Sequence, residues 1–343
     1  MTNARWCTLA IAALLVTARA ERIYFVGNSL TDQIVNYPFP ASSVAMGETV
    51  DWAADVCIGS PLGYHYDNAT CGILKGNLSG GGNAGHFQDA MGSHTWDAIA
   101  LQPFDWTADD GDMREAPVVE WVAEQAMVRN ANVQVYVYAQ YPRNGGANFA
   151  STWNASYSCP TGWDNRSKLY YECVLQQART RIGTGNPVLM IPVGHVVYEL
   201  YQRIQNGTGV PGLTNITQLY SDDVHFNPMG CYVCCATFFA TIFKRNPAGF
   251  PYTGFTGVTA QFAAAVQDAV WKVVTSEPLS GVSATAAAPA VRAAPAHRAI
   301  AAGEAYSLTG RLRGAPRSSD RARSVCVMAT EGRTLRPMFV DRD

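Results

Sequence analysis

The sequence has few charged side chains and no basic run in its main body. Only 15% of its 343 residues are Asp, Glu, Lys or Arg, and the formal net charge is −2. Binding to a nucleic-acid backbone requires a concentrated basic surface, so a nucleic-acid partner is excluded. The 48% of hydrophobic residues likewise excludes a chain that is disordered throughout.

The chain also lacks an obvious membrane-spanning segment. The apolar stretch at residues 9–16 is much shorter than the roughly 20 residues that a spanning helix needs. Arg5 precedes this stretch and Ala18-Arg19-Ala20 follows it, which is the pattern of a signal peptide and its cleavage site. We therefore expect residues 1–20 to be removed, leaving a secreted or cell-surface chain that begins at Glu21 and has no transmembrane segment.

Eight cysteines follow the expected cleavage site, and export would place them in an oxidising compartment. We predict the disulfides Cys57–Cys71 and Cys159–Cys173 because each closes a short loop, although other pairings remain open. The cysteines within residues 231–235 lack the second CxxC and the neighbouring His that a zinc site needs. We interpret them as small buried residues or disulfide partners on a helix.

Charge and composition divide the chain. Residues 278–343 hold ten Arg and five acidic side chains, whereas residues 21–277 hold 13 Lys or Arg and 22 acidic side chains. Residues 278–300 are rich in Ala and Pro, as linkers are. We predict a main domain at 21–277, a linker at 278–300 and a small β-rich appendage at 301–343.

Strand-length apolar segments alternate with helix-length segments in the main domain. Strands are predicted at residues 22–26, 97–101, 133–138 and 188–193, and helices at 115–129, 166–181, 228–243 and 255–274. Such alternation requires crossover connections, which make the strands parallel and cover both faces of the sheet. The predicted fold class is α/β, doubly wound, with ligands expected at the carboxyl ends of the strands.

Two segments carry residues suited to nucleophilic catalysis. Ser29 lies in Gly27-Asn28-Ser29-Leu30-Thr31, directly after the first predicted strand, where its hydroxyl and amide suit a nucleophile and an oxyanion donor. An N-cap serine is the alternative. A nucleophilic serine needs an imidazole and an orienting acid, and His225 and Asp222, three residues apart, supply both. A lone DxxH pattern also fits a metal-site fragment or a surface turn, but its place before the last helices favours catalysis.

These two segments are similar to the first and last sequence blocks of the SGNH hydrolases, also called the GDSL esterase family. The resemblance covers about residues 22–245. It implies a flavodoxin-like three-layer fold and a triad of Ser29 as nucleophile, His225 as base and Asp222 as acid. It implies neither a metal nor an organic cofactor.

The resemblance also suggests an oxyanion hole. The family uses a glycine from a second block and an asparagine from a third, and residues 57–63 resemble the second, with Gly59 as backbone donor. Where the third block usually reads Gly-x-Asn-Asp, this chain has Gln102 directly after the strand at 97–101. Gln102 is therefore the expected side-chain donor beside the amides of Ser29 and Gly59. If Gln102 only caps the strand end, two backbone donors remain.

Other conspicuous residues carry weaker signals. We interpret His195 as a semi-buried structural histidine. His65, His86 and His94 lack carboxylates at a recurring ligand spacing, so we predict no metal site. Aromatic residues gather where strands end or loops begin, and they suit stacking on sugar rings, although core packing is the commoner fate of each. They are Tyr64, Tyr66, Phe104, Trp106, Tyr141 and Trp153.

The combined prediction is a secreted serine esterase that removes acyl groups, with acetyl on carbohydrate as the expected substrate. Lipid or aryl esters are the alternative substrates. A catalytically silent carbohydrate-binding protein on the same fold is the alternative from another class, supported by the missing third-block asparagine. Residues 306–336 resemble C-terminal sorting modules of secreted bacterial enzymes, which implies secretion machinery as a partner; an incidental β-rich appendage or a disordered basic tail is the alternative.

Overall fold

The computed structural model describes most of the main domain, with short gaps. The described residues are 20–36, 39–79, 81–104, 108, 114–162, 166–183, 185 and 188–285. The tail predicted at 301–343, most of the predicted linker and nearly all of the predicted signal peptide therefore lie outside the described residues.

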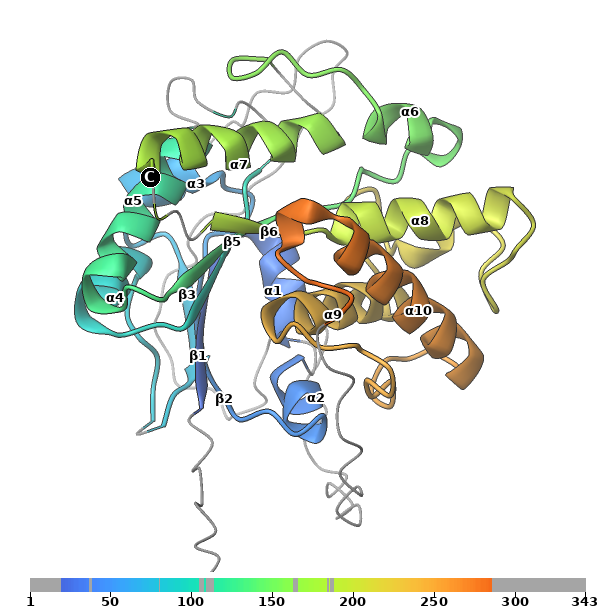
Figure 1. Cartoon of the computed structure of the whole chain (residues 1–343), viewed down its shortest axis with the longest axis horizontal. Coiled ribbons are helices and arrows are strands. Elements are labelled where there is room, and N and C mark those ends of the chain that lie inside the picture. Colours follow the sequence, from blue (N-terminus) through green and yellow to red (C-terminus); the bar gives the residue numbers. More distant parts are fainter. Residues whose placement is uncertain are drawn as a thin grey trace, which may run out of the picture. The chain divides into compact units, whose positions relative to one another are not determined.

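The described residues form a six-stranded sheet with helices on both faces (Figure 1). The strand order is β3-β2-β1-β4-β5-β6, and every neighbouring pair is parallel except β2 and β3. The predicted doubly wound, mostly parallel α/β fold is confirmed. The strands are β1 (Glu21–Gly27), β2 (Val50–Val56), β3 (Ile73–Asn77), β4 (Ala98–Leu101), β5 (Gln134–Tyr138) and β6 (Val188–Ile191).

The central strand β1 is buried on both faces, as its continuous apolar run requires. Ile23 and Phe25 point into one core cluster, and Tyr24 and Val26 point into the other. All four side chains have no solvent exposure. This burial fixes the register of β1, because a slip by one residue would exchange the two faces.

Five helices cover one face of the sheet and four cover the other (Figure 1), counting the α-helices of the described residues and leaving aside α6 (Phe149–Trp153), which contributes to both cores. The first layer contains α1 (Ser29–Asn36), α2 (Phe39–Ala45), α8 (Val193–Gln205), α9 (Pro228–Ile242) and α10 (Ala260–Ser276). The second contains α3 (Leu62–Asp67), α4 (Phe87–Ser93), α5 (Glu115–Arg129) and α7 (Lys168–Ile182).

Helix α9 lies in the centre of its layer. The Asn227 side chain caps it by accepting hydrogen bonds from the amides of Met229 at 2.9 Å and Gly230 at 3.3 Å. Every residue from Gly230 to Ile242 is buried. Of the two interpretations given above for Cys231, Cys234 and Cys235, small buried residues or disulfide partners, the structure supports the first, because all three are buried thiols that form no disulfide among the described residues. Burial raises the pKa of Cys234 to about 12, which keeps its thiol protonated and unreactive at neutral pH.

Two disulfides join segments 14 residues apart, and both match the predicted pairs. Cys57–Cys71 connects the end of β2 to the segment before β3, with a Cα–Cα distance of 5.4 Å. Cys159–Cys173 connects a loop to α7, with a Cα–Cα distance of 5.8 Å. Among the described residues, no helix combines the length and apolar character needed to cross a bilayer.

The topology singles out one crevice. β2 lies on one side of β1 and β4 lies on the other, so the direction of strand addition reverses between β1 and β4. Doubly wound sheets bind ligands outside the carboxyl ends of the strands at such a switch point. Ser29 follows β1 and Gln102 follows β4, so both lie at this crevice.

Candidate active site

The structure brings Ser29, His225 and Asp222 into one chain of contacts. The Oγ of Ser29 lies 2.9 Å from Nε2 of His225, across 196 residues of sequence. The Nδ1 of the same imidazole lies 2.9 Å from Oδ2 of Asp222. Hydroxyl, imidazole and carboxylate are therefore within hydrogen-bonding distance in the order that proton transfer from the serine needs.

The Asp222 carboxylate shapes the loop that carries His225. Its Oδ1 accepts hydrogen bonds from the amides of Val224 at 2.7 Å and His225 at 2.6 Å, while Oδ2 faces the imidazole. Partial burial acts to raise the pKa of Asp222, but the hydrogen bonds from the backbone of His225 and Val224, and then from the imidazole, outweigh it and lower the pKa. The carboxylate is thus ionised and fixed in orientation.

Gln33 ties this loop to the helix that begins with Ser29. Its Nε2 donates to the carbonyl of Phe226 at 2.7 Å, and its Oε1 accepts from the Phe226 amide at 3.3 Å. Phe226 also stacks on Tyr141, with ring centroids 3.4 Å apart. The two hydrogen bonds therefore set the spacing of α1 and the His225 loop, and the ring contact joins that loop to the segment after β5. No sequence pattern pointed to Gln33.

Gln102 contacts the turn on both sides of Ser29. Its Oε1 accepts from the backbone amides of Asn28 at 3.1 Å and Thr31 at 2.8 Å, and its Nε2 donates to Oδ1 of Asn28 at 2.6 Å. The preceding Gly27 is required here, because a Cβ would lie 2.6 Å from Oε1 of Gln102. The bonding favours a role in holding the turn, and the oxyanion role predicted for Gln102 stays a prediction.

Gly59 lies on an exposed turn beside the same site. Its φ of +70° is in the left-handed region that favours glycine. The neighbouring Ser60 donates its amide to the carbonyl of Cys57 at 3.2 Å, and its own carbonyl accepts from Nδ2 of Asn28 at 3.3 Å. Within the described part of the chain, no hydrogen bond of the Gly59 or Ser29 amide is found. Both amides remain available as donors.

Glu115, at the start of α5, joins the two turns that flank the site. Its carboxylate is fully buried and accepts from the Leu62 amide at 3.0 Å and the Phe104 amide at 2.9 Å. Leu62 follows the Gly59 turn and Phe104 follows Gln102. A buried carboxylate needs such donors, and here they fix two loops to one helix. Sequence reasoning missed this residue because it looked like an ordinary helix-start acid.

His195 packs inside the structure, at the start of α8. Its side chain is 10% exposed, and its ring centroid lies 5.1 Å from that of Trp153. Burial, followed by the charge of Lys168, lowers its pKa to about 3, although Glu277 Oε2 lies 3.4 Å from Nε2. Burial dominates because that contact lacks hydrogen-bond geometry. His195 is therefore neutral, as a structural residue would be.

His65 and His86 have a carboxylate neighbour that sequence spacing did not indicate. Asp55 of β2 is fully buried and lies 3.3 Å from a ring nitrogen of each histidine. It also accepts the amide of Phe87 at 2.9 Å, which helps to start α4. No group of three His, Cys, Asp or Glu residues suited to holding a metal occurs in the ranges that the structure describes.

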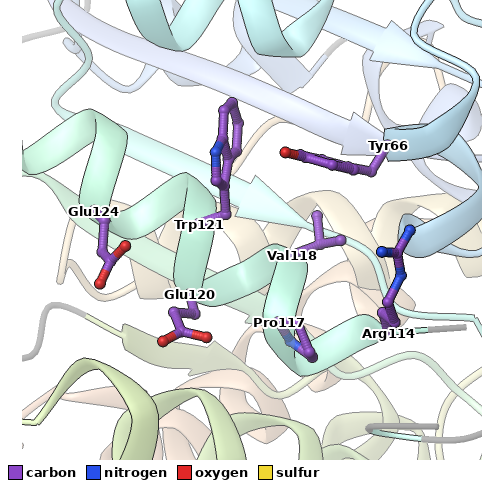
Figure 2. Close-up of a pocket in the computed structure, with 7 residues that line it drawn as sticks. All are labelled: Tyr66, Arg114, Pro117, Val118, Glu120, Trp121 and Glu124. Atoms are coloured by element: carbon purple, nitrogen blue, oxygen red, sulfur yellow. The ribbon is translucent and has the colours of Figure 1, made fainter. Parts of the chain in front are cut away.

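The aromatic residues considered for sugar stacking lie in different parts of the structure. Tyr141 and Trp153 are each 1% exposed and belong to the core, and Trp106 lies outside the described residues. Tyr66 and Trp121 form part of a pocket of about 270 Å³ between α3 and α5 (Figure 2). Neither Ser29 nor its partners line this pocket. Its lining residues are Tyr66, Arg114, Pro117, Val118, Glu120, Trp121 and Glu124.

Comparison with known proteins adds information about the fold. No protein-family model matches the sequence, and no curated protein matches it either. A DUF4886 family protein from Bacteroides uniformis superposes with a TM-score of 0.54 at 14% identity, covering 76% of this chain and 96% of that chain. The two proteins share a fold, and at this identity the likeness says nothing about activity.

Two further solved structures are more distant. A protein proposed to be an SGNH hydrolase, from Slackia heliotrinireducens, has a TM-score of 0.38 at 19% identity, covering 64% of this chain and 98% of that chain. A protein proposed to be a GDSL-like lipase, from Parabacteroides merdae, has a TM-score of 0.37 at 9% identity, covering 66% and 97%. These likenesses are too loose to support an argument about function.

Proposed function

We propose that this chain is a serine esterase that hydrolyses acyl esters through Ser29, His225 and Asp222. The observation that carries the proposal is the contact between Ser29 Oγ and His225 Nε2 at 2.9 Å, with Asp222 on the other ring nitrogen. A serine hydroxyl alone is a weak nucleophile, and an adjacent imidazole base activates it. The position of this group at the switch point of the sheet supports the same conclusion.

The geometry defines the proposed steps. Ser29 Oγ attacks the ester carbonyl carbon while His225 Nε2 takes its proton, and Asp222 holds the tautomer that leaves Nε2 free to accept. The carbonyl electrons move to oxygen, and the amides of Ser29 and Gly59 stabilise that oxyanion. His225 then protonates the departing alcohol, which leaves an acyl-enzyme. A water deprotonated by His225 hydrolyses the acyl-enzyme and restores Ser29.

The proposed substrate class is an acetyl ester on carbohydrate. The Asp222 side chain is 56% exposed and that of His225 is 33% exposed, so the site lies on an open rim. An open rim suits a bulky alcohol such as a polysaccharide. The two disulfides are consistent with an extracellular chain, and export by the predicted signal peptide would bring it to such substrates.

The test compares wild type with Ser29→Ala on p-nitrophenyl esters of increasing acyl length. The proposal predicts hydrolysis of the acetyl ester by wild type, a decline with longer chains, and no activity above background in the variant. Background rates in both proteins would instead indicate a binding protein, and equal rates above background would exclude Ser29 as the nucleophile. Acetate release from a panel of acetylated polysaccharides then identifies the alcohol, and preference for lipid or aryl esters would overturn the carbohydrate assignment.

A further inference from the structure

Gln102 lies completely buried beneath the nucleophile turn. In addition to the two backbone amides, its Oε1 accepts the hydroxyl of Thr31 at 2.5 Å. One side-chain oxygen therefore receives three donors, and Nε2 is bonded to Oδ1 of Asn28 at 2.6 Å. Each bond joins Gln102, which directly follows β4, to Asn28 or Thr31 in the turn that carries Ser29.

These bonds determine which amides of the turn are available to a substrate. The amides of Asn28 and Thr31 donate to Gln102, and the amide of Leu30 donates to Oδ1 of Asn28 at 3.1 Å. Among the described residues, the Ser29 amide is then the donor of this turn that has no protein acceptor. The first-turn amides of a helix are otherwise unsatisfied donors. Gln102 and Asn28 together therefore leave the Ser29 amide as the donor of this turn that is open to a substrate.

We propose that Gln102 is a positioning residue that clamps the turn on both sides of Ser29, and that the backbone amides of Ser29 and Gly59 hold the oxyanion. This inference rests on the esterase activity proposed above. It differs from the sequence-based expectation, in which the Gln102 amide itself donates to the oxyanion. The close packing against Gly27, where a Cβ would lie 2.7 Å from Cβ of Gln102, keeps the clamp in place.

The kinetic test compares esters with thionoesters, in which sulfur replaces the carbonyl oxygen. Sulfur is a weak hydrogen-bond acceptor, so a true oxyanion donor contributes much less to thionoester hydrolysis. Displacing the nucleophile slows both reactions alike. We expect Gln102→Ala to lower kcat by about 10²-fold on p-nitrophenyl acetate and on its thiono analogue, with KM little changed. A loss on the ester alone, with wild-type kcat on the thionoester, would show that the nucleophile is still in place; it would assign Gln102 to the oxyanion hole and overturn the proposal.

A milder variant and a matched control accompany this measurement. Thr31→Val removes one donor to Oε1 of Gln102 and keeps a side chain of similar size. It should lower kcat on the ester and on the thionoester by about tenfold, with little change in KM. Gln176→Ala makes the same change on the exposed face of α7 and should leave both rates unchanged. Wild-type rates in Thr31→Val would contradict the clamp, even if Gln102→Ala does not fold.

Amide hydrogen exchange tests the clamp without relying on hydrolysis. Loss of the Gln102 side chain should accelerate exchange at the amides of Asn28 and Thr31. It should leave unchanged the amide of Asp97, which donates to the carbonyl of Arg22 at 2.9 Å near the other end of the sheet. Unchanged exchange at residues 28 and 31 would refute the clamp. If wild type shows no Ser29-dependent hydrolysis, the proposed function fails, and the exchange result still decides the clamp.

Discussion

Replacing Asp222 with Asn separates the chemistry of the site from the stability of its loop. Oδ1 of Asp222 accepts the amides of Val224 and His225, and an asparagine oxygen can accept both. The asparagine nitrogen then faces Nδ1 of His225, where Oδ2 now lies at 2.9 Å. Nδ1 must become an acceptor, so the proton moves to Nε2. An imidazole protonated at Nε2 cannot take the proton of Ser29.

The expected loss in kcat for Asp222→Asn is about 10³- to 10⁴-fold, because the wrong tautomer removes the general base. The free energy of unfolding should stay within about 0.5 kcal/mol of wild type, since both backbone hydrogen bonds remain. Asp222→Ala serves as the comparison, because it removes the two loop bonds and should also cost about 1–3 kcal/mol of stability.

The assay measures initial rates of p-nitrophenyl acetate hydrolysis at saturating substrate, alongside urea unfolding of each variant. A kcat for Asp222→Asn within about tenfold of wild type would refute the tautomer argument, because general-base catalysis alone contributes about 10²- to 10⁴-fold. Equal stability losses in the Asn and Ala variants would refute the assignment of the two loop bonds to Oδ1.

Three further predictions concern the supporting structure. Glu115→Gln leaves one backbone amide facing another donor, so urea unfolding should show a loss of about 1–3 kcal/mol and kcat should fall; wild-type values would contradict its role. Removing the Cys57–Cys71 disulfide with a double Ser substitution should lower the free energy of unfolding by about 3 kcal/mol, and a loss below about 1 kcal/mol would refute the estimate. The folded-state pKa of His195 is lowered to about 3, so the unfolded chain takes up this proton at a higher pH than the folded chain does. The protein should therefore have the full stabilising contribution of the neutral His195 ring above the unfolded-state pKa of histidine. It should lose about 1.4 kcal/mol of that stability per pH unit as the pH falls from there toward 3. His195→Phe should remove that slope in urea titrations between pH 6 and about 4, and an unchanged slope would assign it elsewhere.

The sequence predicted those elements whose pattern is local and strong. Strand β1 is a continuous apolar run, and α5 occupies the predicted residues 115–129. Strands β2 and β3 were not predicted. Asp51 and Asp55 interrupt the apolar pattern of β2, and β3 is an edge strand whose Ile73 is 52% exposed. Edge strands bury little surface, so hydrophobic pattern marks them weakly.

The candidate site was predictable where topology alone brings residues together. Gln102 contacts the turn that carries Ser29 because the carboxyl ends of adjacent parallel strands lie at one edge of the sheet. The role of Gln102 was not predictable from the sequence. The orientation of its side-chain amide group decides whether Gln102 donates to a substrate or holds the turn. The hydrogen bonds of Gln33 and Glu115 depend on contacts between distant segments that leave no pattern in the sequence.

The most direct test of the account is to identify the acyl-enzyme. Wild-type protein is mixed with p-nitrophenyl acetate, quenched in acid before deacylation is complete, digested and analysed by mass spectrometry. The account predicts an acetyl group on the side chain of Ser29 and none in the Ser29→Ala variant. Continued ester hydrolysis with no acetyl group on Ser29, or with full activity in the variant, would contradict it.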